Sequence, residues 1–170
     1  QADKGLPAGS KVLLVPLVDG RILYDTMHAR IHPIGETNKD VTYTALYDFL
    51  NCLDISPCWG WMNSNATVRN DTWVRAKALG EQLPIVVNMT KGMFKNIEVV
   101  YKGNLYDEGL QSYQGPKWHL IEPVDGFHPS QIANTLLGNY IYENGVEALL
   151  GPKNPNNAKI QQLFGDQGGY

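Results

Sequence analysis

The sequence contains no long apolar run and no excess of positive charge. A transmembrane helix needs about 18 or more apolar residues in succession, whereas the continuous apolar run here, Val12–Val18, has the length of a β-strand. The chain has 14 Lys and Arg against 17 Asp and Glu, and hence a net charge of −3. That balance does not provide the basic surface that non-specific nucleic-acid binding requires, so we expect no nucleic-acid partner.

An initiator Met is also missing, and residues 1–10, QADKGLPAGS, have no apolar core of the kind that signal peptides carry. Such a beginning is expected for a mature protein or for a fragment of a longer chain. The 170 residues suit one domain or a large part of one, and the apolar content of 43% is sufficient for a packed core.

Cysteine is scarce, with two residues in the segment CLDISPCWGW. The gap between Cys52 and Cys58 can close as a small disulfide loop, and Pro57 favours a chain reversal between them. Two thiols at this spacing make a poor zinc site. A disulfide requires an oxidising compartment; the alternative is a cytosolic domain with two free thiols.

Three N-glycosylation motifs of the form N-x-[ST] lie close to the cysteines, at Asn65, Asn70 and Asn88. Each triplet is common by chance, but their clustering beside a possible disulfide predicts a secreted glycoprotein.

Periodicity predicts an alternation of helices and strands. The apolar segments 11–18 and 96–103 are typical of buried strands, with regular pairing in the first ending near Val15 because Pro16 cannot donate to a ladder. Helical spacing predicts further elements over 21–30, 42–53, 70–79, 84–89, 129–150 and 158–164, and 104–124 is expected to be a loop. Two strands make a poor sheet, which indicates the back part of an α/β domain.

His28 and His32 stand four residues apart, a spacing that can present two imidazoles to a metal on one helix face. Pro33 ends any helix directly after His32, and no H-E-x-x-H motif accompanies the pair. We therefore expect no metal site and interpret His32 as a partner of the helix C-terminal dipole. His119 is interpreted as a surface or half-buried histidine.

The strongest chemical signal is D-G-F-H at residues 125–128. In a loop, this spacing lets Asp125 reach the near ring nitrogen of His128 and leaves the far nitrogen free to act as a base. Gly126 permits the tight backbone path that this contact needs. Pro129 suits the first position of the following helix. The alternative is that Asp125 or His128 only caps that helix.

The longer string LIEPVDGFHPS resembles the last conserved block of the SGNH (GDSL) hydrolases, in which an Asp and a His stand three residues apart before the final helix. NKDVTYTALYDFLNCLDISPCWGWM, WHLIEPVDGFHPSQIA and the closing FGDQGGY narrow this resemblance to the acyloxyacyl hydrolase family. The resemblance spans nearly the whole chain.

The resemblance implies a three-layer α/β/α, flavodoxin-like SGNH domain with a parallel sheet, of which residues 1–170 form the C-terminal portion. It also implies a secreted or endolysosomal serine esterase that removes fatty acyl chains from lipopolysaccharide or related lipids. By position, His128 is then the general base and Asp125 its orienting acid, and Cys52 and Cys58 match family cysteines. No cofactor is expected.

The Gly-Asp-Ser nucleophile block and the family's oxyanion blocks are missing from the sequence. Ser10 lacks the Gly-Asp context and precedes a predicted strand, and Ser130 is expected in the first turn of a helix. We therefore expect an N-terminal portion of the same hydrolase, with the nucleophile and the remaining strands, as partner. Without it the chain alone is expected to be inactive. Two alternatives stay open: a nucleophile-less structural or lipid-binding glycoprotein component, and an SGNH esterase acting on phospholipids or acetylated sugars.

Overall fold

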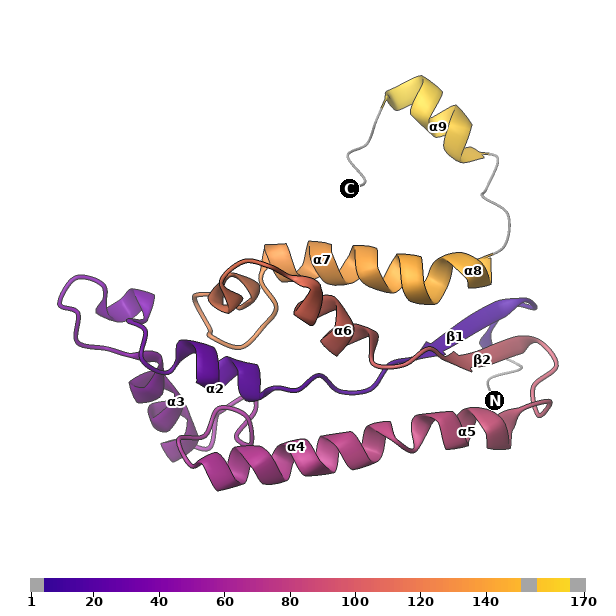
Figure 1. The fold of residues 1–170 in the computed structure, drawn as a ribbon. Coiled ribbons are helices and arrows are strands. Elements are labelled where there is room, and N and C mark those ends of the chain that lie inside the picture. The colour runs from indigo at the N-terminus through magenta and orange to yellow at the C-terminus, as the bar shows by residue number, and fades with distance from the viewer. Residues whose placement is uncertain (1–4, 151–155, 166–170) are drawn as a thin grey trace.

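A computed structural model describes residues 5–150 and 156–165 of the protein (Figure 1). The strands are β1 (Ser10–Leu14) and β2 (Ile97–Tyr101). The α-helices are α2 (Arg21–Met27), α3 (Tyr43–Cys52), α4 (Ala66–Gly80), α5 (Leu83–Thr90), α6 (Leu105–Ser112), α7 (Gln131–Ile141), α8 (Glu147–Leu150) and α9 (Asn156–Phe164). Two 3₁₀ turns, η1 (Pro33–Gly35) and η2 (Lys117–Leu120), and a π-helical turn, η3 (Tyr142–Val146), complete the described elements. Within these ranges, every helix is too short or too polar to span a bilayer.

The two strands pair in parallel, with Lys11 opposite Glu98 and Val12 opposite Val99. Both predicted strands are confirmed, and β1 ends at Leu14, shortly before Pro16. The sheet has two strands in the part of the chain that the structure describes, and all their residues are half-buried or exposed. The burial on both faces that the apolar run predicts is therefore not reached, because a two-stranded sheet leaves much of its surface uncovered.

Helices lie on both sides of this sheet (Figure 1). α5 packs along β2, and α6 packs against α7. The turn η3 approaches β1 so closely that a Cβ on Gly145 would lie 3.0 Å from the side chain of Leu13. A parallel strand pair flanked by helices is compatible with the predicted α/β class.

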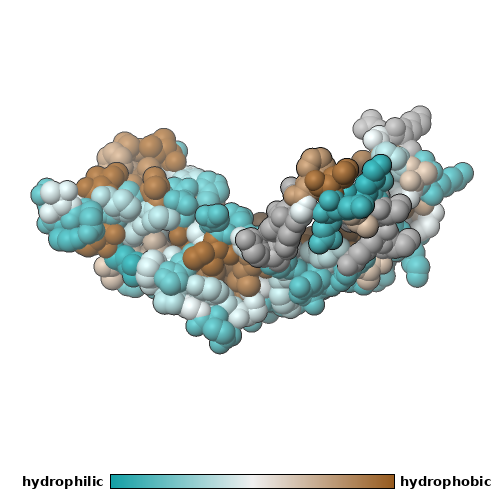
Figure 2. Space-filling view, turned by 90° about the horizontal axis from the view of Figure 1, so that it is seen from above, coloured by the Kyte–Doolittle hydropathy of each residue, from teal (hydrophilic) through white to brown (hydrophobic). Residues whose placement is uncertain are grey.

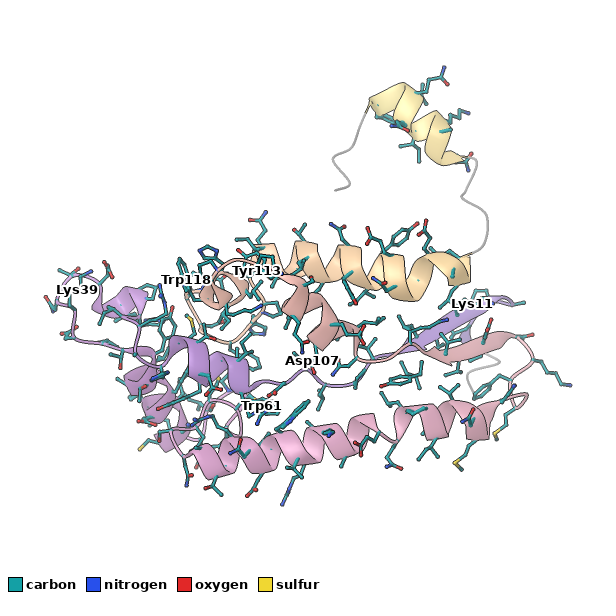
Figure 3. All side chains as sticks on the ribbon, viewed as in Figure 1. Lys11, Lys39, Trp61, Asp107, Tyr113 and Trp118 are labelled. Atoms are coloured by element: carbon teal, nitrogen blue, oxygen red, sulfur yellow. The ribbon has the colours of Figure 1, made fainter. Side chains whose placement is uncertain are left out.

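The main core lies beyond the carboxyl end of β1, where α2, α3 and α4 meet the loop before α7. Figure 3 shows Trp61 next to α4, and a Cβ on Gly20 would lie 2.5 Å from its ring. The absence of a side chain on Gly20 thus lets the indole pack. The buried cluster comprises Leu23, Met27, Tyr43, Tyr47, Trp61, Met62, Ala76 and Ile121. It supports the 121–129 segment that carries the D-x-x-H motif.

The start of α4 corrects the predicted boundary at Asn70. The helix begins at Ala66, and the Asn65 side chain accepts a hydrogen bond from the Thr67 N–H at 2.9 Å as the N-cap. Asn70 lies inside the helix and accepts from the Arg21 guanidinium at 3.1 Å. Since Asn65 and Asn70 are both good cap residues and the apolar pattern of α4 is weak, the sequence does not distinguish them.

Residues 104–124 were predicted to be a loop, and this prediction is wrong. Asn104 caps α6 by accepting from the Asp107 N–H, and η2 follows. Gly109, which weakens the helical pattern, lies against α7, where a Cβ would meet the Leu137 side chain at 3.1 Å. Packing between two helices therefore outweighs the poor local propensity of glycine.

The surface shows how incompletely the apolar residues are covered. In Figure 2, hydrophobic residues gather in separate patches between hydrophilic ones. Exposed large apolar side chains occur along α5 and just after it, among them Ile85, Val86, Met89 and Met93.

Candidate active site

The Asp125–His128 contact predicted from the spacing is present in the loop before α7. Asp125 Oδ2 lies 2.6 Å from His128 Nδ1. The other carboxylate oxygen, Oδ1, accepts from the backbone N–H groups of Phe127 at 2.8 Å and His128 at 3.0 Å. Because a carboxylate only accepts, Nδ1 carries the proton, and Nε2 of a neutral His128 has a free lone pair. No described residue hydrogen-bonds Nε2.

The carboxyl group of Asp125 favours its ionised form. Burial by itself raises the pKa, but the hydrogen bonds from the His128 ring and from the backbone N–H groups of Phe127 and His128 outweigh it. The net effect lowers the pKa of Asp125 below its ordinary value. Near neutral pH the group is an anion, as the orienting acid of a triad requires.

Gly126 has the role that the sequence predicts. Its φ is +65°, in the left-handed region that favours glycine. A Cβ at this position would lie 2.6 Å from the Tyr43 ring and 2.8 Å from the Tyr47 hydroxyl oxygen. Any larger residue would push the loop off the two tyrosines.

The Asp–His pair does not cap α7. Ser130 is the N-cap, and its hydroxyl accepts from the Ala133 N–H at 3.2 Å and donates to the His119 carbonyl at 2.5 Å. Pro129 precedes the cap and is not the first helical residue, which corrects the predicted helix start. The extended backbone at Ser130 explains this, because an N-cap residue keeps non-helical angles. The polar groups of Asp125 and His128 are therefore not used to begin the helix.

An apolar cavity of about 370 Å³ opens beside His128. It lies past the carboxyl end of β1, the end of a parallel sheet at which α/β proteins place their ligands. Phe127 lines this cavity and also packs against the buried cluster. The lining is Leu17, Val18, Gly20, Ile22, Leu23, Cys58, Trp61, Tyr106, Leu110, Leu120, Ile121, Phe127, His128, Pro129 and Leu137.

The His128 ring is largely exposed to solvent. Its side chain is 66% exposed and that of Asp125 is 40% exposed. Both serines considered from the sequence have hydrogen-bond partners other than His128. Ser10 is at the amino end of β1, where its hydroxyl donates to the Pro7 carbonyl, and Ser130 is engaged at the cap. The described residues thus present a hydrogen-bonded imidazole and carboxylate beside an apolar cavity.

The other histidines have structural contacts. His32 is 2% exposed and does not lie at the end of α2, which ends at Met27; the predicted dipole role is therefore wrong. Its Nε2 lies 2.7 Å from the Val124 carbonyl, and its Nδ1 accepts from the Ile34 N–H at 3.2 Å. His119 is half-buried and contacts the Tyr113 hydroxyl at 2.8 Å. In residues 5–150 and 156–165, no three His, Cys, Asp or Glu side chains converge to hold a metal.

The predicted disulfide is not formed. Cys52, the last residue of α3, is exposed, whereas Cys58 is half-buried against the core cluster. Burial raises the pKa of the Cys58 thiol despite a hydrogen bond from the Trp61 backbone. The two side chains occupy different environments, one in solvent and one at the core, so Pro57 does not bring them together. The predicted acceptors Asn65, Asn70 and Asn88 are all exposed on α4 and α5 or at their start.

The sequence did not indicate which side chains hold residues 121–129, the site loop. Tyr43 and Tyr47 donate hydrogen bonds to the carbonyls of Pro123 and Gly126, respectively. Both tyrosines lie in the segment 42–53, for which the helical spacing of apolar residues predicted a helix. Nothing in their spacing indicated that their hydroxyl groups reach a loop about eighty residues later.

Comparison with known proteins identifies relatives along nearly the whole chain, although no protein-family model matches it. It is 46% identical to the acyloxyacyl hydrolase of Homo sapiens, and 44% and 43% identical to those of Oryctolagus cuniculus and Mus musculus. Each match covers 97% of this chain but 29% of the relative. The chain thus spans less than a third of the length of the curated relatives that it matches. These matches confirm the relationship to the acyloxyacyl hydrolase family that the motifs predicted.

Proposed function

We propose that the protein acts in a lipid acyl-ester hydrolase, in which this chain supplies the His and Asp of a Ser-His-Asp triad. The observation that carries the proposal is the 2.6 Å contact between Asp125 and His128 Nδ1, beside an apolar cavity of about 370 Å³. The names of the relatives support hydrolysis of acyl chains. The preferred substrate is lipopolysaccharide or a related lipid.

In this proposal, a serine from the N-terminal portion of the same hydrolase approaches Nε2 of His128 from the exposed side of the ring. His128 takes the hydroxyl proton as the serine oxygen attacks the ester carbonyl, and it returns the proton to the departing alcohol. It then activates water, which releases the fatty acid and restores the serine. Asp125 remains ionised and stabilises the imidazolium.

The oxyanion donors also belong to the partner portion in this proposal. One such donor stabilises the tetrahedral intermediate by roughly 3 kcal/mol, so a base and an acid by themselves are expected to be inactive. The apolar residues that line the cavity beside Phe127 suit an acyl chain, because they remove it from water without unsatisfied polar groups. From the resemblance of the motifs to SGNH hydrolases we also propose the three-layer domain, with the parallel pair β1–β2 as part of its sheet.

We also propose that the hydrolase is secreted or endolysosomal. The exposure of Asn65, Asn70 and Asn88 supports this location, since N-glycans require accessible acceptors. Because Cys52 and Cys58 form no disulfide, they provide no support for an oxidising compartment.

The test of the catalytic role is His128→Ala in the complete hydrolase, with His119→Ala as the matched control. We expect His128→Ala to lower kcat for acyl release at least roughly a thousandfold and to slow labelling by a fluorophosphonate. His119→Ala should leave kcat within about threefold, because His119 contacts Tyr113 and not the reacting groups. A mild loss in His128→Ala would exclude the role, and an absence of labelling in the unmodified hydrolase would favour the nucleophile-less alternative.

A further inference from the structure

The loop that carries Asp125 and His128 is held by side chains from a distant part of the sequence. Three of its carbonyls are bound: Pro123 by the Tyr43 hydroxyl at 2.5 Å, Val124 by His32 Nε2 at 2.7 Å, and Gly126 by the Tyr47 hydroxyl at 2.6 Å. These carbonyls flank Asp125 on both sides. The backbone that sets the direction of its carboxylate is therefore fixed before and after the residue.

The three donors are themselves buried and packed against one another. Tyr47 is 0% exposed, and Tyr43 and His32 are each 2% exposed. Their rings form a continuous contact, with centroids 5.0 Å apart between His32 and Tyr43 and 6.1 Å apart between Tyr43 and Tyr47. Since the Ile34 N–H donates to His32 Nδ1, the neutral ring carries its proton on Nε2 and donates it to the loop.

Both tyrosine hydroxyls stay protonated near neutral pH and therefore remain hydrogen-bond donors. Burial raises the pKa of both phenols, and neighbouring Asp125 raises it further. A neutral phenol that is buried and hydrogen-bonded to a carbonyl keeps one geometry, because leaving the carbonyl unpaired would cost free energy.

The rest of the loop is closed by its own backbone. The Glu122 N–H donates to the His128 carbonyl at 2.8 Å, and the Gly126 N–H donates to the Glu122 carbonyl at 2.9 Å. These bonds fix the curvature of the loop but do not attach it to the body of the protein. Polar attachment comes from the buried donors on α3 and beside η1, in addition to the packing of Ile121 within the core cluster and of Phe127 against it.

We propose that Tyr47 and Tyr43, with His32, are positioning residues for the Asp125–His128 pair. This inference rests on the proposed function of His128 as the general base. The donors do not touch the reacting atoms; they keep the carboxylate aligned with Nδ1 so that Nε2 presents its lone pair in one direction. A displacement of about 1 Å in such a group can cost about a hundredfold in rate.

The test compares Tyr47→Phe and Tyr43→Phe with Tyr24→Phe in the complete hydrolase. Tyr24 is a matched control: its ring belongs to the same aromatic group, 6.2 Å from Tyr47, but its hydroxyl contacts Thr44 at 3.5 Å and not the loop. We expect each loop variant to lower kcat by roughly 10- to 100-fold with KM within about twofold, and Tyr24→Phe to match the unmodified hydrolase.

Two measurements separate positioning from a loss of folded protein. Titration of active sites with a fluorophosphonate counts the competent molecules, so kcat is expressed per competent site. The downfield proton resonance of His128 Nδ1–H, assigned by its disappearance in His128→Ala, should shift or broaden in the loop variants and stay unchanged in Tyr24→Phe.

Loop variants with kcat within twofold of the unmodified hydrolase and an unchanged resonance would overturn the positioning proposal alone. Full activity in His128→Ala would overturn the proposed function, and the positioning proposal with it. If Tyr47→Phe does not fold, Tyr43→Phe decides the question by the same two measurements.

Discussion

At the scale of single residues, the site depends on a carboxylate that stays ionised. Three donated hydrogen bonds hold Asp125 as an anion, two from backbone N–H groups and one from the His128 ring. Gly126 allows this arrangement because its positive φ turns the chain between acid and base. The Asp–His contact could be predicted from the three-residue spacing alone, because it is a local interaction within one turn.

The lowered pKa of Asp125 predicts a pH dependence of stability. A group whose pKa is depressed by folding stabilises the folded state above its unfolded pKa, about 3.9 for Asp, and this contribution is lost as the pH falls through the folded pKa. We expect the stability difference between the complete hydrolase and its Asp125→Asn variant to stay constant down to about pH 5 and to shrink below about pH 4.

Midpoints of urea unfolding at a series of pH values, followed by tryptophan fluorescence, measure this difference. Asp48→Asn is a control, since Asp48 is an exposed residue of α3 without such hydrogen bonds among the described contacts. A difference that grew on acidification would contradict the depressed pKa.

At the scale of elements, α3 connects the core to the site. Its apolar spacing predicted the helix correctly, and Thr42 caps it by accepting from the Ala45 N–H at 3.2 Å. The first residue of the helix is Tyr43, whose hydroxyl binds the Pro123 carbonyl. Fraying of the first turn would therefore release one attachment of the site loop.

In the complete hydrolase, removing this cap by Thr42→Ala should lower the free energy of unfolding by about 1 kcal/mol, because the Ala45 N–H loses its partner. Thr135→Ala on α7 is the control: Thr135 is exposed and its hydroxyl donates to the Gln131 carbonyl within the helix, so we expect little change or a slight gain. Chemical denaturation measures both. Equal losses in the two variants would show that Thr42 has no special role as a cap.

The elements that could not be predicted correctly depend on partners elsewhere in the chain. α6 contains a glycine and few apolar residues, and it forms against α7. His32 was interpreted as a partner of a helix C-terminus because nothing local indicated that its ring would contact the Val124 carbonyl.

At the scale of the whole molecule, the packing is uneven. The core around Tyr47 and Met62 is fully buried, whereas no residue of β1 or β2 is. α5 and the turn after it present Met89 and Met93 to solvent with exposed fractions of 72% and 67%. A parallel pair of this kind needs further strands to cover it.

From the proposed partnership we predict that residues 1–170 produced alone will associate or unfold without cooperativity. When they are produced together with the N-terminal portion, the two should co-purify as one complex. Size-exclusion chromatography and thermal melting of both preparations measure this. A monodisperse, cooperatively melting chain 1–170 would contradict the predicted dependence on a partner.

The sequence by itself determined the strand pair, most of the helices, the Asp125–His128 contact and the relationship to the acyloxyacyl hydrolases. Each of these depends on residues close together in the chain or on motifs that can be read without coordinates. Only the tertiary structure decided that Ser130 begins α7, that Cys52 and Cys58 stay apart, and that Tyr43, Tyr47 and His32 bind the site loop. The physical reason is that a buried hydroxyl or imidazole shows its partner only when the fold brings a distant carbonyl within hydrogen-bonding distance.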